Sequence, residues 1–170
     1  MNHLFWKYLY SFIDVQKMEI KFSKGSNRNW LSCTREDGSN TSVHLGPDIP
    51  FHDIAHFVVE KQFELKKGFF GNIRSGMTIE ELSDPKIIKT LGQESWLAEI
   101  MARNLQALGS QAATSEQFLE LVQWEAQNMK GVKVPNMTTT NVETMAAEYR
   151  RLCADWEMLL ENESLELVFK

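Results

Sequence analysis

The sequence predicts an α+β fold, in which a small antiparallel sheet packs with about four to five helices. Three observations lead to this prediction. The first third of the chain has short segments in which apolar and polar residues alternate, as in half-buried strands. The middle of the chain repeats its apolar residues with the period of a helix, and residues 165–169 alternate again, as a strand that returns to the N-terminal sheet. With 170 residues, the chain is expected to form one domain.

The first three strands are predicted to form a meander within residues 17–45. Residues 17–23 alternate between apolar and polar side chains, and two further short strand segments follow at 29–35 and 39–45. Between those two lies Asp37-Gly38, a dipeptide typical of a tight hairpin turn. The three segments therefore favour antiparallel neighbours joined by short connections.

The best-defined helix is predicted at residues 51–67. Pro50 precedes it, and proline suits the first helical turn because its missing amide hydrogen is not needed there. Lys66 and Lys67 complement the negative end of the helix dipole, and Gly68 is expected to end the helix.

The rest of the helical region, which extends to residue 162, alternates helices and loops. Residues 68–76 are predicted to be a glycine-punctuated loop, whose two phenylalanines either pack in the core or form the wall of a pocket. The further helices are expected to begin at recognisable capping residues. They are a short helix near residues 79–82, one after Asp84-Pro85, one at 93–108, one at 114–128 with Thr114 and Gln117 as a capping box, and, after a loop at 129–137, a long one with Thr140 and Glu143 as a capping box.

Composition limits the range of functions. The net charge of −5 and the scattered lysines argue against a general nucleic-acid surface. The aromatic N-terminal segment, residues 1–16, is too short to span a bilayer and is interpreted as a docking segment for the body of the protein or for a second copy in a homodimer. Two cysteines without a metal-binding or disulfide pattern suit the cytoplasm.

The most informative motif is His52-Asp53-Ile54-Ala55-His56. Residues four apart on a helix point the same way, so the two imidazoles are able to bind one metal ion. The spacing matches the first signature of zinc peptidases, but Asp53 stands where those enzymes have a glutamate. Because Asp is one methylene shorter, it reaches a metal-bound water less easily, and peptidase activity is not expected.

The third metal ligand is expected from another helix. A helical wheel of residues 93–108 places Glu94 within the apolar face, where a carboxylate needs a partner, so Glu94 is the candidate. Glu99 and Arg103 fall on the opposite side and are interpreted as a solvent-exposed ion pair. Glu60, one turn after His56, is expected to act with Asp53 in acid–base catalysis or to support the metal ligands from behind.

The order of these motifs resembles a family of small bacterial proteins that has no established activity. The shared features are an Arg-x-Asp-Gly turn, a Pro-His-Asp-x-x-His-x-x-Val-Glu helix, a Gly-Phe-Phe-Gly segment, a Trp-containing helix and a Leu-Glu-Leu-x-Phe strand. Here Phe51 separates the proline from the first histidine. The matching residues are Arg35–Gly38, His52–Glu60, Gly68–Gly71, Trp156 and Leu165–Phe169.

Two functions follow as expectations. The first is a metal-binding protein, hydrolase-like in its chemistry, with His52, His56 and Glu94 holding zinc or a similar divalent ion and a small molecule as its partner. The second is a non-catalytic binding or assembly protein with structural histidines. A third ligand near both imidazoles beside an open cavity would favour the first, and imidazoles bonded to carboxylates or backbone without a cavity would favour the second.

Overall fold

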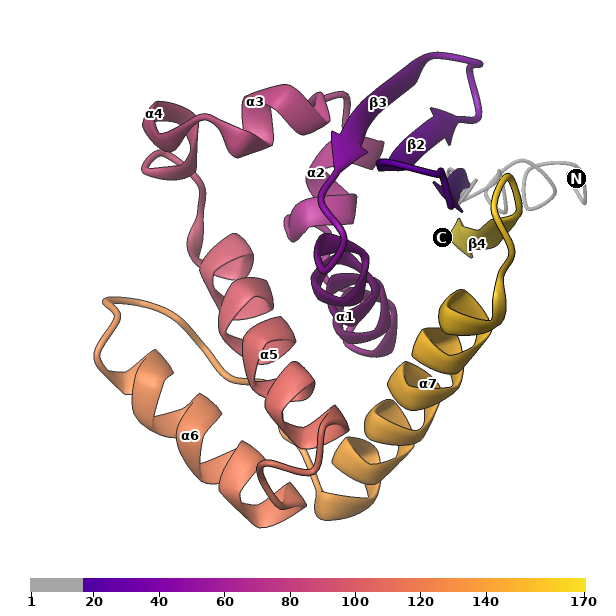
Figure 1. Ribbon diagram of the computed structural model, residues 1–170. Coiled ribbons are helices and arrows are strands. Elements are labelled where there is room, and N and C mark those ends of the chain that lie inside the picture. The colour runs from indigo at the N-terminus through magenta and orange to yellow at the C-terminus, as the bar shows by residue number, and fades with distance from the viewer. Residues whose placement is uncertain (1–16) are drawn as a thin grey trace, which may run out of the picture.

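A computed structural model describes residues 17–170 and confirms the α+β prediction (Figure 1). The strands are β1 (Met18–Ser23), β2 (Asn29–Arg35), β3 (Asn40–Leu45) and β4 (Ser164–Phe169). They form one antiparallel sheet in the order β3-β2-β1-β4, so the C-terminal strand pairs with the first strand. All four strands lie within a residue or two of their predicted positions.

Seven helices are found in the described part of the chain. Helix α1 lies between α5 and α7, and α6 packs on the side of α5 away from α1 (Figure 1). The two short helices α3 and α4 extend to one side of the sheet and lead down to the start of α5. The helices are α1 (Ile49–Gln62), α2 (Phe69–Arg74), α3 (Ile79–Ser83), α4 (Pro85–Ile88), α5 (Gln93–Gly109), α6 (Ser115–Gln127) and α7 (Thr139–Met158).

The core lies between one face of the sheet and the helices. Alternation in β1 decides which face of the sheet is buried, because Met18, Ile20 and Phe22 are fully buried while the residues between them face outward. Phe169 of β4 completes the buried row beside Met18, its partner in the sheet. The hairpin between β2 and β3 turns at Gly38, whose φ of +83° is a left-handed conformation that glycine adopts without strain.

Helix α1 ends earlier than predicted, at Gln62 rather than residue 67. Glu64 takes the left-handed conformation that usually falls to glycine at a helix end, with φ of +51°. The amide of Leu65 then donates to the carbonyl oxygen of Glu60 at 3.0 Å, which closes the last turn. Gly68 therefore does not end α1; it precedes α2.

The predicted loop at 68–76 contains helix α2, and the buried carboxylate of Glu60 explains it. The Glu60 oxygens accept hydrogen bonds from the amides of Phe69, at 2.7 Å, and Gly71, at 3.0 Å. These amides belong to the first turn of α2, where no carbonyl of the same helix is available to them. A side chain from α1 thus satisfies a helix start that local sequence does not cap. Phe70 packs in the core, whereas Phe69 faces a cavity described below.

The capping residues were predicted with mixed success. The Thr114 and Gln117 capping box at α6 is present, and Asp84 caps α4 as expected. The long helix α7 instead begins with a capping box of Thr138 and Asn141, two residues earlier than Thr140 and Glu143 would give. The expected N-terminal docking segment lies outside the described residues. Within residues 17–170, the helices lack the combination of length and apolarity needed to cross a bilayer.

Gly68 offers a test of the contact with Glu60. A methyl group at Gly68 would lie 2.2 Å from the Glu60 carboxyl carbon, so one of the two must move. We expect Gly68→Ala to lower the free energy of unfolding in urea by about 1–3 kcal/mol.

Gly92→Ala is the matched control, because Gly92 also precedes a helix but a methyl group there would meet no atom within 4 Å. Loss of a capping glycine affects both variants alike, so the difference between them measures the clash. Equal losses in the two variants would contradict the close contact.

Candidate metal centre

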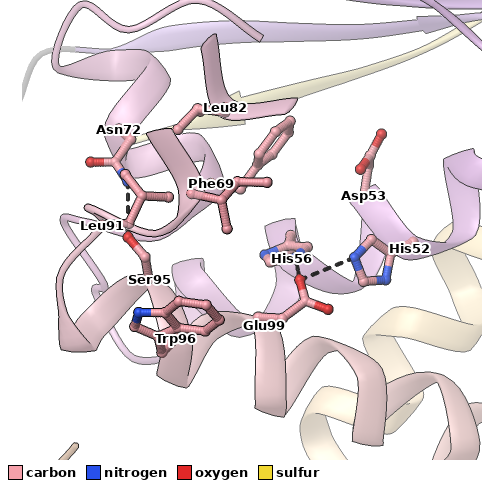
Figure 2. Close-up of a pocket in the computed structure, with 11 residues that line it drawn as sticks. His52, Asp53, His56, Phe69, Asn72, Leu82, Leu91, Ser95, Trp96 and Glu99 are labelled. Carbon is pink, nitrogen blue, oxygen red and sulfur yellow. Dashed lines mark hydrogen bonds and ion pairs between the residues drawn. The ribbon is translucent and has the colours of Figure 1, made fainter. Parts of the chain in front are cut away.

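Three side chains from α1 and α5 meet at one point (Figure 2). The Oε2 atom of Glu99 lies 3.1 Å from Nε2 of His56 and 3.4 Å from Nε2 of His52. One ligand atom from each of these residues lies within 4.8 Å of the other two. The two histidines converge as predicted from their spacing, because they are one turn apart on α1.

Both imidazoles are oriented from behind by a second hydrogen bond. Nδ1 of His52 lies 2.8 Å from Oε1 of Gln106, and Nδ1 of His56 lies 3.1 Å from Oε1 of Glu60. Since both partners are oxygen acceptors, each Nδ1 carries the proton and donates it. This leaves both Nε2 atoms facing Glu99, the arrangement seen where histidines bind metals with an oxygen partner on the other nitrogen.

Glu60 is placed behind the site and does not line the cavity. Its side chain is fully buried and its oxygens accept from His56 and from two backbone amides of α2. Of the two roles expected for Glu60, this position corresponds to supporting the ligands and does not suit direct catalysis. A buried carboxylate with three donors is held rigidly, and so is the ring of His56.

Glu94 does not join the histidines, contrary to expectation. Its Oε1 atom accepts a hydrogen bond from the backbone amide of Lys66 at 3.0 Å, in the connection between α1 and α2. The expected ion pair between Glu99 and Arg103 is also absent from the described residues, since Arg103 pairs with Glu125 of α6. Glu99 is the carboxylate that reaches both imidazoles.

A polar stripe on α5 was the sequence signal that could have identified Glu99. Ser95, Glu99 and Gln106 are spaced by four and seven residues, which places them along one side of a helix. All three contact α1 or α2: Ser95 bonds Asn72, Glu99 bonds both histidines, and Gln106 bonds His52. A stripe of this kind along a buried helix indicates a polar interface.

A cavity of about 380 Å³ opens beside the three side chains. Asp53 of α1 lines it together with both histidines and Glu99. The Asp53 side chain is buried, and no other described residue donates a hydrogen bond to it. In Figure 2, the apolar side chains of the wall, with Trp96 and Phe69 among them, gather on the side of the cluster away from His52.

Burial and the neighbouring charged groups shift the pKa values of the side chains in the cluster. Burial by itself lowers the pKa of His56, but the hydrogen bonds to Glu60 and Glu99 outweigh it and raise that pKa to about 9. The hydrogen bonds from His52 and His56 hold the pKa of Glu99 well below its usual range. Burial raises the pKa of Asp53 to about 6, against the opposing charges of the two histidines.

Comparison with known proteins finds no matching family model, curated protein or solved structure. The chemistry of the site therefore follows from its geometry. Two imidazole nitrogens and a carboxylate oxygen form a donor set that suits zinc, iron and similar divalent ions. The three candidate ligands come from two helices, and the side toward the cavity is open.

The charge of His56 can be measured directly. In protein kept metal-free with a chelator, we expect the His56 ring to titrate well above pH 6.5 by NMR, because Glu60 and Glu99 favour its protonated form. A group whose pKa is raised by folding stabilises the folded state below its unfolded pKa of about 6.5. That contribution is lost as the pH rises through about 9.

The urea midpoint of the metal-free protein should accordingly fall between about pH 7 and pH 10, and His56→Gln should reduce this fall. Glu99→Gln keeps the shape of the site but removes one charge, so it should lower the pKa of His56. An unshifted His56 titration, near its ordinary pKa of about 6.5, would show that the two carboxylates do not act on it.

Proposed function

We propose that this protein binds one divalent metal ion, zinc or a similar ion, through His52, His56 and Glu99. We further propose that it uses the ion to hydrolyse a small molecule held in the adjacent cavity. The observation that carries the proposal is the convergence of two Nε2 atoms on one oxygen of Glu99, at the wall of a cavity, with both Nδ1 atoms already engaged by oxygen.

The spacing of the ligand atoms supports the metal. In a tetrahedral zinc site with bonds of about 2.0–2.1 Å, ligand atoms are separated by about 3.3 Å. The two distances from Glu99 to the imidazoles, 3.1 and 3.4 Å, have this size, and all three candidate ligand atoms lie within 4.8 Å of one another. Charge supports it too, because Asp53, Glu60 and Glu99 surround only two imidazoles, and a divalent cation would balance the excess of negative charge.

Asp53 is the candidate general base. It lines the same cavity and has no hydrogen-bond donor among the described residues, so its carboxylate is free to accept a proton. A bound divalent ion would polarise a carbonyl group and lower the pKa of a water molecule. Asp53 would take a proton from the attacking water as the oxygen joins the carbonyl carbon. It would return that proton to the leaving oxygen or nitrogen as the carbon–heteroatom bond breaks.

The competing function is a non-catalytic binding protein with structural histidines. It is favoured by one observation: every fully buried polar side-chain atom of the described residues has a hydrogen-bond partner, so the cluster is satisfied as it stands. The cavity beside the cluster argues against it, because a structural network gains nothing from an adjoining space. Metal content separates the two functions.

Metal content should depend on the three ligands and not on Glu94. Protein purified without an affinity tag and supplied with zinc should contain about one ion per chain by elemental mass spectrometry. His52→Ala, His56→Ala and Glu99→Gln each remove a donor or its charge, and we expect each to lower zinc affinity at least about 100-fold.

Glu94→Gln is the matched control for Glu99→Gln, since it makes the same change on the same helix, and it should retain the ion. Circular dichroism of each variant checks that the fold persists. A metal-free wild type after supplementation would overturn the proposal in favour of structural histidines.

The role of Asp53 has a separate test. With zinc bound and a panel of p-nitrophenyl esters as substrates, Asp53→Asn should lower kcat by about 100- to 10,000-fold, because the proton acceptor is lost. Its zinc content should match that of the wild type.

Asp155→Asn serves as the control, because Asp155 is on α7, where it pairs with Arg151. Full activity in Asp53→Asn would exclude Asp53 as the base and leave the metal site in place.

A further inference from the structure

The walls of the cavity divide into a polar end and an apolar end. His52, His56, Glu99 and Asp53 form the polar end, where the reaction would occur. Opposite them the wall is formed by apolar side chains from α2, α3, α4 and α5 and from the turn between α4 and α5 (Figure 2). These are Phe69, Leu82, Ile88, Leu91 and Trp96.

At the apolar end, the side-chain amide of Asn72 and the hydroxyl of Ser95 have no hydrogen left to donate, which leaves the indole N–H of Trp96 as the side-chain donor there among the described residues. Both hydrogens of the Asn72 amide are used, by the carbonyl oxygen of Lys67 and by Oγ of Ser95, each at 3.0 Å. The Ser95 hydroxyl in turn donates to the same carbonyl oxygen. Among the described residues that line the cavity there is no lysine or arginine. A phosphate or carboxylate group would find no cation there and too few donors to replace its hydration.

The roof of the cavity is an apolar surface that the described residues cover only in part, since Leu82 is buried but its neighbours in the roof are not. Leu82, Ile88 and Leu91 come from the segment that contains α3 and α4, between Gly76 and Gly92. Ile88 and Leu91 remain half-buried, and no residue of α4 is fully buried. Apolar side chains around a cavity of this kind are stabilised when an apolar group displaces the water there.

We infer that the cavity binds an uncharged small molecule with an apolar arm, whose polar group lies at the histidines and whose arm lies against Trp96 beneath the roof segment. Esters and amides of aromatic or medium-chain acids belong to this class, and molecules with an anionic arm do not. This inference rests on the proposed function for the polar end. The cavity of about 380 Å³ corresponds to about a dozen water molecules at about 30 Å³ each, so the molecule has roughly a dozen non-hydrogen atoms.

Hydroxamic acids that share one metal-binding group but differ in the rest of the molecule test whether the cavity prefers an apolar arm. Titration calorimetry on the zinc-loaded protein would compare acetohydroxamic acid, benzohydroxamic acid and the monohydroxamate of succinic acid. We expect benzohydroxamic acid to bind about 10- to 100-fold more tightly than acetohydroxamic acid, because its ring is buried in the cavity. The succinate derivative should gain nothing from its carboxylate arm.

Two variants test which side chains give benzohydroxamic acid its higher affinity. Trp96→Ala should remove most of the advantage of the benzene ring and leave acetohydroxamic acid unchanged. Leu91→Lys places a cation in the roof and should reverse the preference toward the carboxylate arm. If benzohydroxamic acid binds no better than acetohydroxamic acid, or if Leu91→Lys leaves the order unchanged, the inference is wrong while the metal site stands.

A probe without a metal-binding group separates this inference from the proposed function. Benzamide and acetamide would be titrated into metal-free protein while the indole N–H signal of Trp96 is followed by NMR, with Trp96→Ala for its assignment. Benzamide should shift the signal, and acetamide, which lacks the ring, should not. Should zinc fail to bind while benzamide does, the proposed function falls and the inferred occupant remains. Failure of benzamide to shift the signal would overturn the inference.

Discussion

The buried carboxylate of Glu60 is the constraint on which this part of the structure depends. A charge with no exposure to water is tolerated only when its oxygens are fully bonded, and here three donors from two directions provide that. The two amides fix the start of α2 against α1. A side chain at 68 would meet the carboxylate of Glu60, and one at 71 would meet the backbone of the connection between α1 and α2, so glycine suits both positions. The third donor, His56, is turned toward α5 by the same contact.

From Glu60 the polar contacts run outward in a line through His56 to Glu99 and the cavity. Exposure increases along this line, since Glu60 is fully buried, His56 is buried, and Glu99 is partly open. Gln106 does for His52 what Glu60 does for His56, at the more exposed end of the cluster. The site is thus supported on two sides, and its third side faces the cavity.

The sequence predicted the strands and most helices well because their periodicities are local properties of the chain. The histidine pair was found for the same reason. The start of α2 was missed because its cap is Glu60, eight residues upstream of Gly68 and on another helix. Glu99 was missed because its spacing to Arg103 is typical of a surface pair, and no local pattern shows that α1 covers that side of α5. Glu94 was chosen for its place on the wheel, but its partner is a backbone amide from a loop.

The sheet order places β1 between one strand that is near it in the sequence and one that is far from it. Its pairing with β2 joins residues close in sequence, whereas its pairing with β4 joins Met18 to Phe169. A ribosome therefore releases the meander and the seven helices of the described chain before the strand that covers the free edge of β1. Until then that edge presents unpaired backbone groups, which favour association with other chains. Closure of so long a loop is also slow relative to local pairing, so the last strand sets the pace at which the sheet is completed.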